Sequence, residues 1–384
     1  MADVIVPGDG VLVGRAIVPG FSFPRVVTVR EGALYDITWH LAPTVRDIAE
    51  LPNPAEYVRD ADGTRIGDLD AILANSWHDE HKPSLASLLS PIDLQAVKAA
   101  GVTFVVSLLE RVIEEQARGD KGKADALRGD ILKLIGTDLS QLVPGSDAAM
   151  QVKETLVARG VWSQYLEVGI GPDAEVFTKS QPMSTVGYGA DVGVLPISQW
   201  NNPEPEVAVV VSSAGRIIGA TLGNDVNLRD VEGRSALLLG KAKDNNASAS
   251  LGPFIRLFDE HFTLDTIKRA EIALTVTGED GFKLEGHSSM SQISRSPEAL
   301  VASTVGQHHQ YPDGFVLYLG TMFAPVKDRE GPGKGFTHKM GDIVSISTPS
   351  LGMLSNRVRY STDCPPWTYG ASQLMRDLAK AGLL

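Results

Sequence analysis

Cysteine is almost absent from this sequence. Among its 384 residues there is a single cysteine, Cys364. One thiol excludes an internal disulfide, and it cannot supply a metal site built from several thiolates. Stability must therefore come from packed side chains, and any metal ion must be bound by oxygen or nitrogen ligands.

The sequence also lacks the segments that direct a chain to a membrane. Its start, Met1-Ala2-Asp3, carries no basic side chain, and no long apolar run follows. We therefore expect neither a signal peptide nor a membrane span. A cytoplasmic location is the corresponding expectation.

Basic residues are fewer than acidic ones. Lysine and arginine number 35 against 47 aspartates and glutamates, which gives a formal net charge of −12. Nucleic acids and anionic membranes bind basic surfaces, so both are excluded as expected partners. A small anionic substrate that is bound by a local cation remains compatible with this charge.

The composition that is present, 43% hydrophobic and 21% charged, is typical of a globular protein. A chain of this length predicts one large or two modest domains. Short strand-like runs, separated by Gly and Pro, fill the first part of the chain, at 10–18, 25–29 and 33–38. We predict a β-rich N-terminal domain, a helical connecting segment and a catalytic domain, at 1–96, 97–165 and 166–384. Residues 112–151 of the connecting segment are a candidate lid.

The strongest chemical signal comes from acidic residues beside two apolar runs. Glu204 and Glu206 lie two positions apart and lead into the run 207–211, which is typical of a buried strand. Residues i and i+2 of a strand point to the same face, so the two carboxylates lie side by side. A second run, 217–222, ends near Asp225. If the two strands pair as a hairpin, Asp225 lies beside the glutamates.

Three converging carboxylates favour a hard divalent cation. Oxygen ligands with room for water suit Mg²⁺ or Mn²⁺ and, less well, Ca²⁺. The alternative is a solvated sheet edge, because two glutamates at the start of a strand are common without a metal ion. From the residues alone, both interpretations stay open.

Several motifs in the second half of the chain resemble, in order, those of the fumarylacetoacetate hydrolase superfamily. They are FTK at 177–179, PEPEVAVVV at 203–211, GNDVNLRD at 223–230, KAKDNNASASLGP at 241–253, LYLGT at 317–321, KMGDIV at 339–344 and LGMLSNRV at 351–358. Several motifs in order are far more specific than any one of them. The resemblance implies a mixed α/β, mostly β chain, in which a β-roll catalytic domain of that superfamily follows a smaller N-terminal domain. It also implies a homodimer or a higher homo-oligomer.

The resemblance further implies roles for individual residues. Lys243 would lie close to the metal ion and the substrate, and Thr321 would hold a substrate carboxylate. Lys179 and Gln181, beside the FTK motif, are candidates for substrate contact; the alternative for Lys179 is a strand-end lysine in water. The implied ligands of Mg²⁺ or Mn²⁺ are Glu204, Glu206 and Asp225.

The segment 101–115 departs from the superfamily pattern. The hydrolases carry G-x-N-Y-x-x-H-x-x-E there, and its His and Glu form a dyad that activates water. In this chain Phe104 falls at the tyrosine position, Ser107 at the histidine position and Glu110 at the glutamate position. A serine is not a base near neutral pH without a partner base. Ser107 therefore indicates that water activation is lost, and Glu110 remains a candidate catalytic residue.

These features favour a dehydratase. A divalent ion that chelates a 2-oxo acid would stabilise the enolate formed when a C3 proton leaves, and the enolate would expel a hydroxyl from C4. KAKDNNAS at 241–248 and HQYPDGF at 309–315 resemble the 2-keto-3-deoxy-pentonate dehydratases of sugar-acid catabolism. Those enzymes convert a D-arabinonate- or D-xylonate-type 2-keto-3-deoxy-D-pentonate to 2-oxoglutarate semialdehyde and water. We expect Lys243 or Glu110 to move the C3 proton.

Two alternatives remain. The first is a hydrolase that cleaves a carbon–carbon bond in acylpyruvates or 2,4-diketo-3-deoxy sugar acids, with another histidine, for example His308, as the missing base. The second is a non-catalytic protein that binds sugar acids on the same fold. Lys243 beside the carboxylates argues against the second, since a binding protein does not need such a group next to an enolisable substrate.

Overall fold

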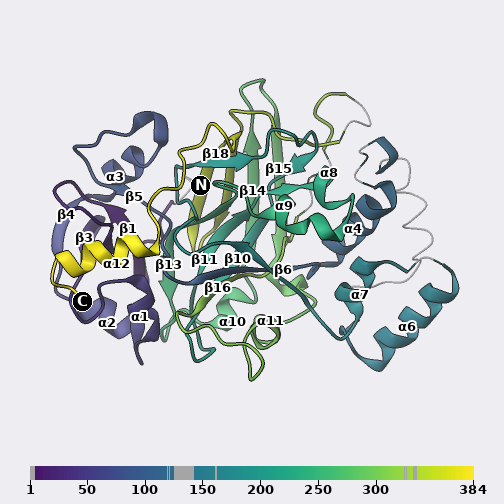
Figure 1. Cartoon of the computed structure of the whole chain (residues 1–384), viewed down its shortest axis with the longest axis horizontal. Helices are drawn as coiled ribbons and strands as arrows, with labels where there is room; N and C mark the ends of the chain where they lie inside the picture. The colour runs from purple at the N-terminus through teal and green to yellow at the C-terminus, as the bar shows by residue number, and fades with distance from the viewer. Residues whose placement is uncertain are drawn as a thin grey trace.

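The computed structural model (Figure 1) describes residues 5–118, 120, 122–124, 142–160, 162–323, 325, 327–331 and 335–384, with the backbone alone at residue 106. The strands predicted in the N-terminal part are confirmed as β1 (Leu12–Ile17), β2 (Arg25–Arg30) and β3 (Ala33–Asp36). Two further strands join them, β4 (Thr64–Asp68) and β5 (Ser87–Leu88). Three helices were not predicted: α1 (Val45–Glu50), α2 (Pro54–Asp60) and α3 (Leu69–Asn75). With six or seven residues each, they are too short to show a clear helical period.

The predicted hairpin of apolar runs is confirmed at the centre of the main sheet. Its strands are β10 (Pro205–Val211) and β11 (Ile217–Asp225), which pair antiparallel. Strands from distant parts of the sequence flank them: β13 (Ala249–Leu257), β16 (Phe315–Tyr318), β6 (Ala96–Gly101) and β7 (Glu175–Ser180). Within the described residues the sheet has eleven strands in the order β4-β3-β2-β1-β13-β11-β10-β16-β6-β7, with β5 paired to β1. Because β1 pairs with β13, one sheet runs through the N-terminal and catalytic parts, and the domain boundaries at 96 and 165 stay a prediction.

A second sheet packs against the first. Its order is β15 (Lys283–Ser289), β14 (Glu271–Thr277), β17 (Ile343–Thr348), β18 (Gly352–Tyr360) and β8 (Asp191–Val194). A short pair, β9 (Asn201–Asn202) and β12 (Asn227–Leu228), adjoins the hairpin. The large share of strands confirms the mixed α/β, mostly β fold.

Strand β10 is buried on both faces. Val207 and Val209 pack in one apolar cluster with Ile346 of the second sheet. Ala208 packs on the opposite side, in a cluster that includes Ile48 of α1. Burial of both faces explains why the run is continuously apolar instead of alternating with polar residues.

Helices cover both ends of the molecule. At one end (Figure 1), α4 (Val105–Ala117), α6 (Asp147–Ala158) and α7 (Gln164–Ile170) pack around Leu108, Leu156 and Leu166. At the other end, α12 (Ala371–Lys380) lies across the N-terminal part and packs against it through Leu374 and Leu378. The remaining helices are η1 (His78–Glu80), α8 (Arg229–Glu232), η3 (Ala236–Leu238), α9 (Leu239–Lys243), α10 (Leu264–Ile267), η4 (Met290–Gln292) and α11 (Pro297–Thr304). The candidate lid at 112–151 lies partly outside the described residues. In the described part of the chain, every helix is too short or too polar to cross a bilayer.

The close approach of the hairpin to β16 depends on a glycine. A Cβ atom at Gly223 would lie 2.3 Å from a ring carbon of Tyr318. We predict that Gly223→Ala lowers the free energy of unfolding by about 1–3 kcal/mol, because a buried aromatic ring would have to move. Gly240→Ala is the matched control, since no atom lies within 4 Å of its added carbon. Chemical denaturation of both variants is the test, and equal stability of the two would contradict this account of the packing.

Candidate active site

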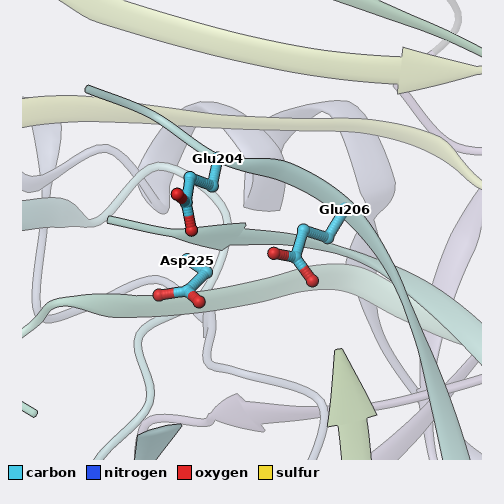
Figure 2. Close-up of side chains that lie close together, drawn as sticks. All are labelled: Glu204, Glu206 and Asp225. Carbon is cyan, nitrogen blue, oxygen red and sulfur yellow. The ribbon is translucent and has the colours of Figure 1, made fainter. Parts of the chain in front are cut away.

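The hairpin register brings the three predicted carboxylates together. Glu206 pairs with Gly223 across the two strands, and paired residues point to the same face. Glu204 and Asp225 lie two positions from these partners, so all three side chains leave the sheet on the same side. One carboxylate oxygen from each residue lies within 4.8 Å of the other two. Figure 2 shows the three groups pointing toward one another from neighbouring strands.

All three carboxylates are buried, with exposed fractions of 1–2%. Three cations offset their charge. The Lys243 ammonium lies 2.5 Å from Oε2 of Glu204 and 3.1 Å from Oδ2 of Asp225. The Lys179 ammonium lies 2.8 Å from Oδ1 of Asp225. Arg111 of α4 donates a hydrogen bond to Oε1 of Glu204.

The surroundings shift the pKa values of the three acids in different directions. Burial, together with the charges of Asp225 and Glu204, holds the pKa of Glu206 well above its ordinary value. Burial also raises the pKa of Glu204, against the opposing charges of Lys243 and Arg111. For Asp225 burial acts in the same upward direction, but the charges of Lys179 and Lys243 outweigh it and lower the pKa. Glu206 is therefore the acid of the three that is most in need of a further positive charge.

The wider charge balance also indicates a divalent ion. Six carboxyl groups gather here, of Glu114, Glu175, Glu204, Glu206, Asp225 and Glu232, among four cations, Arg111, Lys179, Arg229 and Lys243. With all acids ionised, two negative charges remain unmatched. The carboxylates also border a cavity of about 10 Å³, the size of a single water molecule. Ligand type, charge and space thus all fit one hard divalent cation.

The residues around this cavity include several of those predicted from the sequence. Besides the carboxylate trio, Ser107, Lys243 and Thr321 line it. Ser107 lies in the first turn of α4. Thr321 follows β16, and its hydroxyl donates to the carbonyl of Phe323 at 3.1 Å.

Three other predicted residues, Lys179, Gln181 and Glu110, do not line the cavity. Lys179 is fully buried beside Asp225, and its ammonium also donates to the carbonyls of Val226, at 3.2 Å, and Lys243. It is therefore not a strand-end lysine in water. Gln181 is exposed and donates to Asp244 at 3.2 Å. Glu110 is half-buried on α4, and the residues that line the cavity do not include it.

Sequence reasoning missed two charged residues that line the cavity, Arg111 and Glu175. Arg111 lies four positions after Ser107, which places both on one side of α4. Glu175 shares the strand period of two with Phe177 and Lys179 on β7. The helical spacing of four and the strand spacing of two could have indicated these residues. They do so only when it is already known which face of the helix or strand points to the site.

Glu175 reaches the cavity because β6 carries a glycine opposite it. Gly101 pairs with Glu175 across the strands, and a Cβ atom at Gly101 would lie 2.0 Å from Oε2 of Glu175. The carboxyl group occupies the space that any other side chain would fill. Burial and the negative charge of Glu232 raise the pKa of Glu175 to about 7. A carboxyl group with this pKa can both accept and donate a proton near neutral pH.

Metal binding at this site should release protons. A divalent ion needs Glu206 ionised, whereas the raised pKa favours its protonated form in the metal-free protein. We predict that binding of Mg²⁺ releases protons and that affinity falls as the pH is lowered. Titration calorimetry in two buffers of different ionisation enthalpy measures the release. Glu206→Gln should abolish it, and a wild-type value of zero would contradict the prediction.

Comparison with known proteins places this fold and site in a family. Residues 166–359 match the family described as fumarylacetoacetate (FAA) hydrolase, C-terminal, and they make up just over half of the chain. A probable 2-keto-3-deoxyxylonate dehydratase of Haloferax volcanii is 26% identical over 336 residues, which cover 87% of this chain and 95% of that protein. A 2-dehydro-3-deoxy-D-arabinonate dehydratase of Saccharolobus solfataricus is 32% identical over 185 residues, 48% of this chain and 58% of that protein.

A solved structure shares the fold. It is that of a 2-keto-3-deoxy-D-arabinonate dehydratase complexed with magnesium and 2,5-dioxopentanoate. It matches with a TM-score of 0.59 at 21% identity, over 91% of this chain and 99% of that one. The carboxylate hairpin, the two sheets and the matched residues lead to one conclusion: the chain belongs to the fumarylacetoacetate hydrolase family.

Proposed function

We propose that the protein is a dehydratase that requires Mg²⁺ or Mn²⁺ and converts a 2-keto-3-deoxy-D-pentonate to 2-oxoglutarate semialdehyde and water. Two relatives bear the names of dehydratases of this substrate class. The 2,5-dioxopentanoate in the solved structure is the same compound as 2-oxoglutarate semialdehyde. The observation that carries the proposal is Ser107, which lines the cavity and falls at the position of the histidine that activates water in the hydrolases.

The carboxylate trio would hold the divalent ion. When bound, that ion supplies a Lewis acid that polarises the 2-oxo acid end of the substrate and makes its C3 protons acidic. Lys243 adds a second positive charge beside that position. Burial alone would lower the pKa of Lys243, but the carboxylates of Asp225 and Glu204 outweigh it and raise the pKa, which favours the charged ammonium.

Glu175 is the group best suited to move protons. It lines the cavity, and its pKa of about 7 lets it take up and give back a proton at neutral pH. Arg111 is unsuited to this role, because a guanidinium stays protonated. Ser107 and Thr321 offer hydroxyl groups that can donate to or accept from the substrate. The sequence-based assignment of the proton transfer to Lys243 or Glu110 stays a prediction.

The proposed reaction balances with one carboxyl group, that of Glu175, as the carrier of the proton. Glu175 takes a proton from C3, the C4–O bond breaks, and the same proton can leave with the hydroxyl as water. The new double bond between C3 and C4 then migrates toward C5 as a proton leaves C5 and another joins C3. The resulting enol becomes the aldehyde of the product. No oxidant or reductant is needed.

The hydrolase alternative finds less support in the structure. It needs a replacement base, and His308 is exposed in the turn that precedes β16. The site lies beyond the other end of that strand, where Gly320 and Thr321 follow it. A four-residue strand spans about 13 Å. His308 therefore cannot take the place of the lost histidine without a rearrangement of the sheet.

The proposal includes a homodimer or higher homo-oligomer in the cytoplasm, by analogy with the metabolic enzymes that the chain resembles. Light scattering on the purified protein measures the oligomeric state.

The products distinguish the proposed reaction from its alternative. With Mg²⁺ and a panel of 2-keto-3-deoxy-pentonates, we expect one product that keeps all five carbons and is lighter than its substrate by one water. Mass spectrometry of the quenched reaction identifies it. Pyruvate or another short fragment would show a hydrolase, and no turnover on any member of the panel would favour the non-catalytic binding protein.

Two carboxyl variants test the proton carrier. We predict that Glu175→Gln lowers kcat at least about 100-fold, because an amide neither accepts nor donates the transferred proton. Glu110→Gln is the comparison, since this residue is the sequence-based candidate on the neighbouring helix. A loss of kcat in Glu110→Gln together with full activity in Glu175→Gln would reverse the assignment. Unfolding curves of both variants exclude a general loss of structure.

A further inference from the structure

The loop that connects β16 to β17 carries one of the residues that line the cavity. The structure describes this loop, 321–342, at 321–323, 325, 327–331 and 335–342. Thr321 at its start lines the cavity, and its hydroxyl donates to the carbonyl of Phe323 at 3.1 Å. The position of this hydroxyl therefore depends on what holds the residues that follow it.

The first part of the loop contacts the edge strand of the second sheet at two points. A Cβ atom at Gly286 of β15 would lie 2.6 Å from the ring of Phe323, so the ring packs directly on this glycine. The Lys327 ammonium donates to the carbonyl of Lys283, the first residue of the same strand. Both contacts hold the loop against β15.

Arg329 provides the strongest anchor of the loop. Its guanidinium donates to both oxygens of Asp342, at 2.6 and 2.7 Å, immediately before β17. It also donates to both oxygens of Asp280, at 3.0 and 3.3 Å, in the turn between β14 and β15. The side chains of Arg329 and Asp342 are only 1% exposed. One planar guanidinium thus joins the loop to two points of the second sheet, which an ammonium group could not match in geometry.

The last part of the loop returns to the active site. Arg329 donates to the carbonyl of Thr337 at 3.3 Å. The Thr337 hydroxyl accepts from the N–H of Asn201 at 3.2 Å and donates to the carbonyl of Gln199 at 3.2 Å. Asn201 lies three positions before Glu204, the first of the three carboxylates. Arg329 therefore lies between the two parts of the loop that adjoin the site.

We propose that Arg329 positions the Thr321 hydroxyl for a hydrogen bond to the substrate, through the loop that it anchors. Arg329 itself does not line the cavity, so it is a positioning residue. The proposal rests on the proposed function for the identity of the substrate, a sugar acid. It adds to that function a determinant of substrate binding that lies outside the cavity.

Steady-state kinetics of Arg329→Met test the proposal. We expect KM to rise about tenfold, as for the loss of one hydrogen bond to a charged group, and kcat to change less than about threefold. The contact is made in the ground state and in the transition state alike, so its loss acts on KM. Unchanged KM, or a fall of kcat alone, would overturn the proposal.

A second substitution shows whether Arg329 acts through Thr321. Thr321→Val removes the hydroxyl and keeps the shape of the side chain, and we expect a similar rise in KM. In the double variant, Arg329→Met should raise KM little further, because the group that it positions is already absent. Two independent increases that multiply in the double variant would contradict the proposed route.

Arg357→Met is the matched control. Arg357 belongs to β18 of the same sheet and also joins two acids, Asp191 at 2.9 Å and Asp79 at 3.0 Å, but it lies outside the loop. We expect unfolding curves to show a loss of stability in both arginine variants, with KM at the wild-type value in Arg357→Met. An equal rise of KM in both would indicate a general loosening of the sheet and would overturn the proposal. If Arg329→Met does not fold, Asp280→Asn removes the more exposed acid and should raise KM to a smaller extent.

Hydrogen exchange followed by mass spectrometry examines the anchor without a substrate. In Arg329→Met we expect the amides of 321–331 to exchange faster than in the wild type, while those of β10 keep their wild-type rates. In Arg357→Met the exchange of 321–331 should stay unchanged. A protein that shows this pattern but dehydrates no sugar acid would refute the proposed function alone. Wild-type exchange of 321–331 in Arg329→Met would refute the anchor itself.

Discussion

The burial of like charges at the end of an apolar hairpin is the constraint on which the site depends. To take one ion out of water costs several kcal/mol, even after the protein relaxes. The three carboxylates lie within 4.8 Å of one another and are almost fully buried. Such a cluster is stable only if positive charge is brought to it, and helix α4, strand β7 and helix α9 each contribute one cation.

These cations also determine the chemistry. Arg111 and Lys243 cannot serve as bases in their charged forms, so the wall of the cavity favours the stabilisation of negative charge over the activation of water. Glu175 is the exception, because Gly101 leaves room for its carboxyl group at the edge of the charged cluster. The cavity of about 10 Å³ has room for an ion or a water molecule. A sugar acid is larger, so side chains of the wall must move when it binds, and the long stem of Lys243 makes it the most adaptable of them.

The parts of this arrangement that the sequence predicts are those with a local signature. Glu204, Glu206 and Asp225 follow from the period of a strand and a short hairpin, and the position of Lys243 beside them follows from its motif. The contact of Arg111 with Glu204 joins residues 93 positions apart, and no local pattern predicts such a pair. Gln181 and Glu110 are residues that the sequence predicts near the site but that do not line the cavity. Their positions in motifs predict that they are near the site, but whether a side chain lines the cavity depends on the packing of the whole element.

The shared sheet gives the first 96 residues a role in solubility. Strand β13 is bordered by β11 on one side and by β1 on the other. A shortened chain without β1 would leave β13 with a row of unpaired N–H and C=O groups along one edge. Exposed strand edges of this kind pair with strands of other chains and lead to aggregation. The N-terminal strands thus protect the catalytic strands from intermolecular pairing, and a fragment that keeps every residue of the metal site would still be prone to self-association.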